Sequence, residues 1–312
     1  MKLQTPTPQA RCCIVTAREE RSERLTESLG PDALNTRQVA ALKAGFLRQA
    51  SVRARKLVSP ANVLLSAQEA DRSTWEGPFW FTRPANRFIT DPGAPSSLST
   101  AAAVLSVAAG SPSCLIVVLP SDFWVARESV LREGIDRTSR LLQLIPESVV
   151  TLGMMDTYPE SDEDYLVVGP NNAHKGAVIQ ARVNRPEPRV AQQLVIEGAM
   201  VASGILLGYA HAFAARIRKY WPHLAHELTH AMEPDCDSDQ EHRFSADLYR
   251  HIPGRVINSI RLSSATFPMR AFQVQGCGWC SRKPLKEIRP AAASDRRAYT
   301  RGPNIVTGDH PS

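Results

Sequence analysis

The sequence contains one pentapeptide with the residue types of a zinc-dependent hydrolase. Residues 226–230 read HELTH, within the longer stretch YWPHLAHELTHAMEPD at 220–235. Two histidines four residues apart share one face of a helix, where both imidazoles can bind one metal ion while the glutamate between them activates water. The chemistry that this pattern suggests is metal-dependent hydrolysis.

The helix that must carry HELTH favours a surface position for its histidines. Pro222 is suited to the first turn of that helix, and an apolar stripe recurs every four residues at Leu224, Leu228 and Met232. At about 100° per residue, His226 and His230 lie about 200° around the helix from a stripe leucine. We therefore expect both histidines to point away from the core and into solvent.

A zinc protease needs the opposite arrangement, with the histidines lining a cleft and a third ligand nearby. No spacing selects that ligand among the candidates, which are Glu233, Glu241 and His242. Incidental metal binding by the exposed face of His223, His226 and His230 fits the pattern better than catalysis. The zinc hydrolase is therefore the most remote of the functions considered.

The bulk composition is that of an ordinary globular protein. Of the 312 residues, 43% are hydrophobic and 22% are charged. The first residues, MKLQTPTPQAR, lack the apolar core of a secretory signal. The most apolar stretch, 199–215, contains Ser203, Gly204, Tyr209 and His211, and it is shorter than the roughly 20 apolar residues of a membrane span. We expect a cytoplasmic protein without a membrane partner.

The charge of the chain permits an anionic partner. The formal net charge is +6, but the arginines are spread through several segments and form no basic stripe interleaved with aromatic residues. That distribution argues against nucleic acid and is compatible with phosphorylated small molecules.

The six cysteines favour reduced thiols in a cytosolic protein. They stand at positions 12, 13, 114, 236, 277 and 280, and Cys277 and Cys280 form the motif CGWC. An isolated CxxC is a weak indication of metal binding or redox chemistry.

Short apolar runs alternate with helical patterns along the chain. Runs typical of buried strands are RCCIVTA, NVLLSA, CLIVVLPSD, SVVTLGM, AVIQARVN, AMVASGILLGYA and AFQVQG, and helical patterns cover 33–58, 99–109, 122–145 and 187–198. This order predicts an α/β fold with a mostly parallel sheet covered on both faces. We expect one domain over 11–290, an N-terminal extension over 1–10 and a disordered tail over 291–312.

Asp122 follows the most continuous apolar run. Ligands of open α/β sheets bind beyond the carboxyl ends of the strands, where a carboxylate can hold Mg²⁺ beside a phosphorylated substrate. The alternative is that Asp122 only caps a helix that begins at Phe123. The residue pattern leaves these two roles equally open.

A series of motifs resembles the sugar-phosphate nucleotidyltransferases, most closely the mannose-1-phosphate guanylyltransferases. In chain order the motifs are IVTA…RL, TRQ, STAAAVL, LIVVLPSD, YPESDEDYLVVG, RVNRPEP, AMVASGILLGYA and GCGW, spread between residues 11 and 288. The resemblance implies a Rossmann-like α/β/α nucleotidyltransferase fold. It also implies a Mg²⁺-dependent reaction in which GTP and mannose 1-phosphate give GDP-mannose and pyrophosphate.

Site residues follow from the same motifs. The resemblance implies that Asp122 is the catalytic, metal-binding aspartate. It assigns nucleotide binding to Arg24, Gln38 and Thr100, and binding of the sugar phosphate to Arg185 and Gly204.

The sequence departs from the family pattern at two important places. The first loop, rich in glycine in the family, carries Arg18, Glu19 and Arg21, and Ser281 occupies the position of a second metal-binding aspartate. Without glycine, the backbone cannot as easily close around phosphate groups. These departures leave open a non-catalytic protein of the same fold that binds a nucleotide or a protein partner.

Overall fold

The structure, a computed structural model, describes residues 10–17, 36–92, 94, 96–155, 161, 163–169, 176–232, 240–245, 247–248 and 269–280. A central sheet dominates this part of the chain, with strands in the order β10-β3-β2-β1-β4-β9-β6-β11-β8-β7. The strands are β1 (Arg11–Thr16), β2 (Val63–Gln68), β3 (Arg87–Thr90), β4 (Leu115–Pro120), β6 (Val149–Met154), β7 (Asp164–Val168), β8 (Ala177–Asn184), β9 (Met200–Tyr209), β10 (His242–Phe244) and β11 (Arg270–Val274).

The sheet is mixed, which corrects the prediction of a mostly parallel one. The half formed by β10, β3, β2, β1 and β4 is parallel, whereas β9 runs antiparallel to both β4 and β6, and β8 runs antiparallel to β7 and β11. A continuous apolar run such as that of β9 indicates that the strand is buried on both faces of the sheet. It carries no information on strand direction, which the connections decide.

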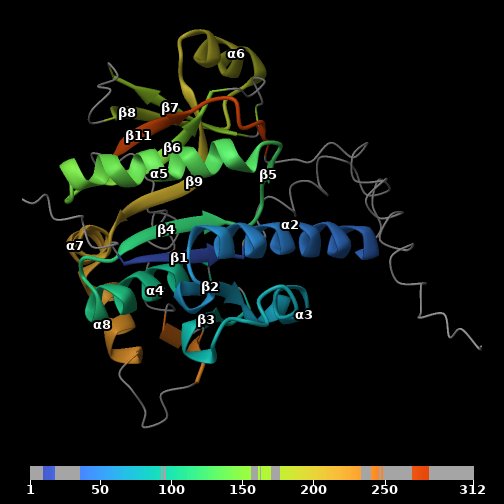
Figure 1. Cartoon of the computed structure of the whole chain (residues 1–312), viewed down its shortest axis with the longest axis vertical. Coiled ribbons are helices and arrows are strands. Elements are labelled where there is room, and N and C mark those ends of the chain that lie inside the picture. The colour runs from blue at the N-terminus through green and yellow to red at the C-terminus, as the bar shows by residue number, and fades with distance from the viewer. Residues whose placement is uncertain are drawn as a thin grey trace, which may run out of the picture.

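Helices cover both faces of the sheet and make three layers, as Figure 1 shows. The helices are α2 (Thr36–Leu57), α3 (Arg72–Trp75), α4 (Ser96–Gly110), α5 (Glu128–Leu144), α6 (Pro188–Ile196), α7 (Ala210–Tyr220) and α8 (Pro222–Ala231). The α/β/α architecture predicted from the sequence is therefore confirmed. The predicted domain and tail boundaries stay predictions, because residues 281–312 lie outside the described part.

The two faces of the sheet can be told apart by the alternation of side chains along β1. Ser66, opposite Thr16 in the neighbouring strand, bonds to residues of α4. Cys13 is out of phase with Thr16 and lies in the electrostatic field of Arg53 on α2. The helices α2 and α5 thus cover one face, and α4, which packs against α7 and α8, covers the other.

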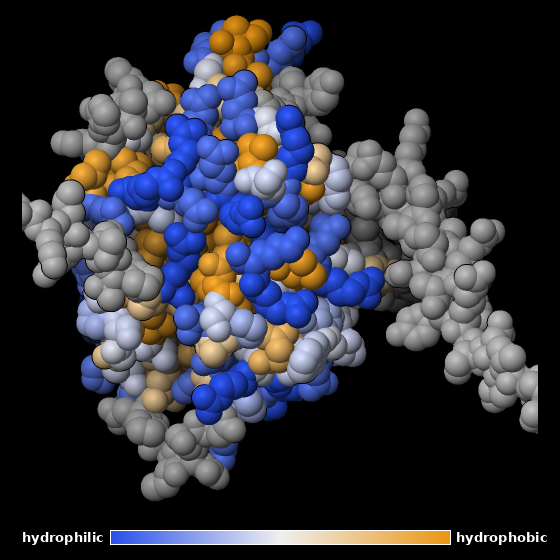
Figure 2. Space-filling view, viewed as in Figure 1, coloured by the Kyte–Doolittle hydropathy of each residue, from blue (hydrophilic) through white to orange (hydrophobic). Residues whose placement is uncertain are grey.

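One large hydrophobic core fills the space between sheet and helices. Its largest fully buried side chains are Trp75, Phe79, Phe88, Phe123, Tyr165, Phe213 and Phe244. The face shown in Figure 2 is mostly hydrophilic, and hydrophobic atoms at its top lie over α6, whose exposed apolar residues are Val190 and Ile196. No helix in the described part of the chain is long and apolar enough to cross a membrane.

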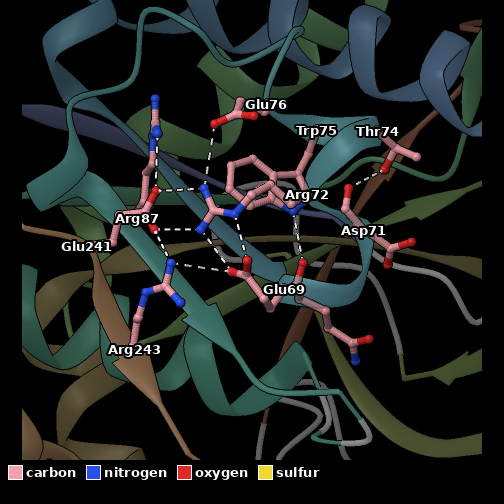
Figure 3. A network of polar contacts seen from close by, with 10 residues as sticks. Glu69, Asp71, Arg72, Thr74, Trp75, Glu76, Arg87, Glu241 and Arg243 are labelled. Carbon is pink, nitrogen blue, oxygen red and sulfur yellow. Dashed lines mark hydrogen bonds and ion pairs between the residues drawn. The ribbon is translucent and has the colours of Figure 1, made fainter.

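A network of arginines and glutamates joins the edge strand β10 to the β2–β3 region (Figure 3). Arg72 bonds with both carboxylate oxygens of Glu69 at 2.8 Å and of Glu241 at 3.1 and 2.6 Å. Arg87 and Arg243 each lie 3.2 Å from Glu241. The hydrogen bonds from Arg72 and Arg87 hold the pKa of Glu241 at about 2, below its ordinary value.

Candidate functional site

The parallel strands β1, β2 and β4 end side by side. Thr16 lies opposite both Ser66 and Pro120. Two backbone bonds continue the pairing just past the ends of β1 and β4, from Ala17 N to Ser66 O at 2.9 Å and from Ser121 N to Thr16 O at 3.0 Å. This is the edge of an α/β sheet at which ligands bind.

Asp122 follows β4 directly at this edge and is 5% exposed. The helix predicted from residue 122 begins only at Glu128, because residues 124–125 form the short strand β5 (Trp124–Val125). Asp122 therefore does not cap a helix that begins at Phe123, and this alternative is wrong. Periodicity missed the boundary because Phe123, Trp124 and Val125 continue the helical apolar pattern.

A cluster of hydroxyl groups lies beside Asp122's edge of the sheet, on the α4 side. The Ser66 hydroxyl is 2.8 Å from that of Ser99 and 2.9 Å from that of Thr100, and all three residues are buried. Thr16 Oγ1 is also buried and has no hydrogen-bond partner among the described residues. Thr100 is thus placed close to the strand ends, and its binding of a nucleotide stays a prediction.

Gly204 reaches the same edge from β9. Val118 of β4 lies opposite Leu206, and the strands are antiparallel, so Gly204 lies level with the end of β4. Gly204 has φ of 80°, in the left-handed region that favours glycine, at a bulge where Ser203 donates a 2.7 Å bond to Leu152 O. A position without a side chain permits close approach of a ligand to the backbone, and binding of the sugar phosphate at Gly204 stays a prediction.

Arg185 lies further along the same end of the sheet. It follows β8, whose last residue pairs with Asp164 of β7, next to the residue that pairs with β9. Arg185 is exposed, and its φ of 43° is unusual for a non-glycine residue before proline. The topology thus brings Asp122, Gly204 and Arg185 to one end of the sheet.

The side chains of three further residues with sequence assignments, Arg24, Gln38 and Ser281, are outside the described part of the structure. Arg24, together with the loop residues Arg18, Glu19 and Arg21, lies outside the described residues, as does Ser281. Gln38 lies in the first turn of α2. Their roles in binding stay predictions.

A short two-stranded sheet places the CGWC motif beside Asp122. Strand β12 (Trp279–Cys280) pairs antiparallel with β5, and the ring of Trp279 lies 6.3 Å from that of Phe123. Trp279 is the last residue of the GCGW stretch that resembles the family. Its contact with the neighbour of Asp122 places β12 beside the candidate metal ligand.

The described cysteines are free thiols, as the sequence favoured. Four are buried, and Cys280 is half-buried. Burial raises the pKa of Cys13 to about 12, and a hydrogen bond with Cys114 together with burial raises that of Cys12. Cys13 is therefore a protonated, unreactive thiol at neutral pH. Cys236 lies outside the described residues.

We expect Gly278→Ala to separate β12 from β5. Gly278 has φ of 63°, and a Cβ atom there would stand 2.7 Å from Ala126 Cβ. Strain and clash together are expected to cost about 2 kcal/mol of unfolding free energy, measured by chemical denaturation. Gly110→Ala, on α4, is the control because no atom lies within 4 Å of its added Cβ. Equal stability of the two variants would contradict the packing described here.

HELTH lies on the surface helix α8 with the orientation predicted from the sequence. Leu224 and Leu228 are buried, and His226 and His230 are exposed. Two proposed third ligands are engaged elsewhere, since Glu241 belongs to the arginine network and the His242 ring stacks on Phe88 at 4.6 Å. Glu233 lies outside the described residues.

Replacing both His226 and His230 by alanine is expected to change the unfolding free energy by less than about 0.5 kcal/mol, because both are exposed. Equilibrium denaturation measures this change, and metal analysis of protein purified without chelators accompanies it. Stoichiometric zinc in the wild type that disappears in the double variant would instead support a zinc site.

The residues at the strand ends fit a Mg²⁺ ion that arrives with a phosphorylated substrate. Magnesium prefers oxygen ligands and is commonly held by one or two carboxylates together with substrate phosphates. Asp122 supplies one buried carboxylate, and the Thr16 hydroxyl is a further neutral oxygen nearby. Among the described residues, no three side chains of His, Cys, Asp or Glu gather into a metal-binding group. The substrate would therefore supply much of the coordination.

Comparisons with known proteins agree with this architecture. A structure named as mannose-1-phosphate geranyltransferase from Thermus thermophilus superposes with a TM-score of 0.64 and 16% identity, covering 88% of this chain and 76% of that one. A structure named as mannose-6-phosphate isomerase from Helicobacter pylori gives a TM-score of 0.60 and 14% identity, covering 86% of this chain and 99% of that one.

No protein-family model and no curated protein sequence matches the chain. At these identities the structural matches establish the fold. They agree with the α/β fold that the sequence resemblance implied.

Proposed function

We propose that this chain is a nucleotidyltransferase that joins a nucleoside triphosphate to a sugar 1-phosphate. The observation that carries the proposal is the position of Asp122, a buried carboxylate immediately beyond β4. A carboxylate at this place can hold Mg²⁺ beside phosphate groups, because ligands of α/β sheets bind beyond the carboxyl ends of the strands.

The proposed reaction is a displacement at phosphorus. An oxygen of the sugar phosphate forms a bond to the α-phosphorus of the triphosphate. The bond from that phosphorus to the oxygen bridging to the β-phosphorus breaks, and pyrophosphate leaves with the electron pair. Such transfers need in-line positioning and neutralisation of charge more than covalent help from the protein.

Different groups of the protein would bind the metal, the nucleotide and the sugar. Asp122 would hold Mg²⁺, which supplies positive charge to the phosphates. Thr16 and Thr100 lie on the β1–β2 side, where the nucleotide would bind with Arg24 and Gln38. Gly204 would admit the sugar close to the backbone.

Arg185 completes the sugar side as an exposed cation for the sugar phosphate. Its planar guanidinium can form two parallel hydrogen bonds with a phosphate group. The left-handed backbone at this residue sets the direction of the side chain, and such unusual conformations gather at binding sites.

We place GTP and mannose 1-phosphate first among the substrates. The motifs of the sequence resemble those of mannose-1-phosphate guanylyltransferases, and the similar Thermus structure is named for mannose 1-phosphate. These likenesses support the choice of sugar more directly than the choice of base.

The test is Mg²⁺-dependent release of pyrophosphate with a panel of nucleoside triphosphates and sugar 1-phosphates. We expect release with at least one pair, and first with GTP and mannose 1-phosphate. The Asp122→Asn variant is the control for contaminating enzymes. If folded protein releases no pyrophosphate with any pair in the panel, the proposal is overturned and a non-catalytic binding protein is favoured.

A further inference from the structure

Arg53, near the end of α2, is a buried arginine that the site as described does not use. Its side chain is 4% exposed, and its guanidinium meets both carboxylate oxygens of Glu128, with Nε 2.8 Å from Oε2 and Nη2 2.5 Å from Oε1. Glu128 is the first residue of α5. The ion pair therefore ties α2 to the beginning of α5.

The same guanidinium lies over the ring of Phe123, 4.4 Å from its centroid. Phe123 is fully buried and follows Asp122 directly, and its ring contacts that of Trp279. Arg53, Phe123 and Trp279 thus form a continuous contact from α2 to β12. The backbone continues this connection, because Arg127 N bonds to Cys277 O at 2.9 Å and Ala126 N to Gly278 O at 3.2 Å.

Stability alone gives a poor account of Arg53. The Glu128 carboxylate is 42% exposed, so the attraction is partly screened by water. Nη1 of Arg53 is buried and has no hydrogen-bond partner among the described residues, which is unfavourable for a charged group. A hydrophobic side chain would fill the space without this cost. An apolar residue would not provide a planar group that binds Glu128 at two points and stacks on Phe123.

We propose that Arg53 is a positioning residue, which holds Phe123 against Trp279 and so fixes the backbone that carries Asp122. The inference rests on the function proposed above and adds to it the group that sets the site's geometry. Residues that orient a metal ligand affect chemistry without touching the substrate.

The first measurement compares steady-state kinetics of Arg53→Met with those of Arg55→Met. Arg55 lies one half-turn along α2, is exposed, and stacks on Phe81 at 5.0 Å, so its variant controls for loss of an arginine–ring contact on this helix. We expect kcat of Arg53→Met to fall roughly 10- to 100-fold, the range for groups that orient metal ligands. The KM for the metal-bound nucleotide should rise by up to about tenfold, because orienting groups also affect metal affinity. The kcat and KM of Arg55→Met should change little.

Two further variants separate geometry from folding. Arg53→Lys keeps the charge but lacks the planar fork, so it should restore thermal stability more than kcat. Glu128→Gln alters the exposed end of the ion pair and should lower kcat in the same direction as Arg53→Met. A lower melting temperature with unchanged kcat in the folded Arg53 variants would show a purely structural role and overturn the inference.

The second measurement does not depend on turnover. Electron paramagnetic resonance gives the affinity of the Mn²⁺–GTP complex for wild type, Asp122→Asn and Arg53→Met. We expect Asp122-dependent binding that Arg53→Met weakens by roughly tenfold. If wild type binds Mn²⁺–GTP in this way but releases no pyrophosphate, the proposed function fails and the positioning role stands. Equal affinity in wild type and Arg53→Met, or no binding that depends on Asp122, overturns the positioning role.

Discussion

Asp122→Asn is expected to lower kcat for nucleotidyl transfer by roughly a hundredfold or more, because a metal-bound carboxylate contributes several kcal/mol to stabilising transferred charge. The amide has nearly the shape of the carboxylate, so the packing around residue 122 should change little. What is lost is the negative charge that we propose to hold Mg²⁺ at the end of β4. Pyrophosphate release at saturating substrates measures the effect.

The control for this substitution is Asp136→Asn. Asp136 lies on α5, is 42% exposed and bonds to Arg11 at 2.9 Å, so its neutralisation removes a carboxylate from the surface. We expect kcat of this variant to remain close to that of wild type. Raising the Mg²⁺ concentration should partly rescue Asp122→Asn. Equal kcat in wild type and Asp122→Asn would remove Asp122 from the reaction.

Glu241→Gln is expected to lower the unfolding free energy at pH 7 by about 3 kcal/mol, the equivalent of the depressed pKa of this carboxyl group. Glu241 is 14% exposed and accepts hydrogen bonds from Arg72 and Arg87, with Arg243 also 3.2 Å away. Glutamine keeps the shape and loses the charge, so three arginines are left around a neutral group.

The dependence on pH follows from the direction of the shift. The folded-state pKa of Glu241 is about 2, below the ordinary value of 4.5. The stabilisation is therefore fully present above about pH 4.5 and is lost as pH falls towards 2. Hydrogen bonding to Arg72 lowers the pKa of Glu69 as well, which adds acid sensitivity in the same direction.

Denaturant titrations between pH 7 and pH 2 test this expectation. The gap in unfolding free energy between wild type and Glu241→Gln should close as the wild-type carboxyl group is protonated. Glu76→Gln is the matched control, because Glu76 also contacts Arg72, at 3.6 Å, but is 56% exposed and exposed ion pairs contribute little. A gap that stayed constant with pH would show that the charge of Glu241 is not the cause.

Most elements of the fold could be predicted from local patterns. The strands β1, β2, β4 and β6 and the helix α2 begin and end within a few residues of the expected positions. Runs of apolar residues and a 3.6-residue periodicity are local properties of the sequence. They predict strands and helices correctly because the same apolar residues form the core. The start of α5 was missed because Trp124 and Val125 satisfy the helical pattern while pairing with β12.

Some residues of the candidate site could likewise be proposed from the sequence, and others could not. Asp122 could be proposed from the sequence because a carboxylate follows the most continuous strand. Thr100, Arg185 and Gly204 could be proposed because their motifs resemble a family. Arg53 could not be found, since nothing in RQASVRARK distinguishes the buried arginine from the exposed Arg55. Ser66 could not be identified from the sequence either, because it lies within an otherwise apolar strand.

By itself, the sequence determined the alternation of strands and helices, the outward direction of His226 and His230, and the position of Asp122 after a buried strand. Each depends on neighbours within a few residues along the chain. Only the tertiary structure decided that β9 runs antiparallel between β4 and β6, that Arg53 reaches Phe123, and that β12 returns to β5. These contacts join residues far apart in the sequence. Local periodicity does not depend on the direction of a distant strand or on the partner of a side chain, so it cannot predict either of them.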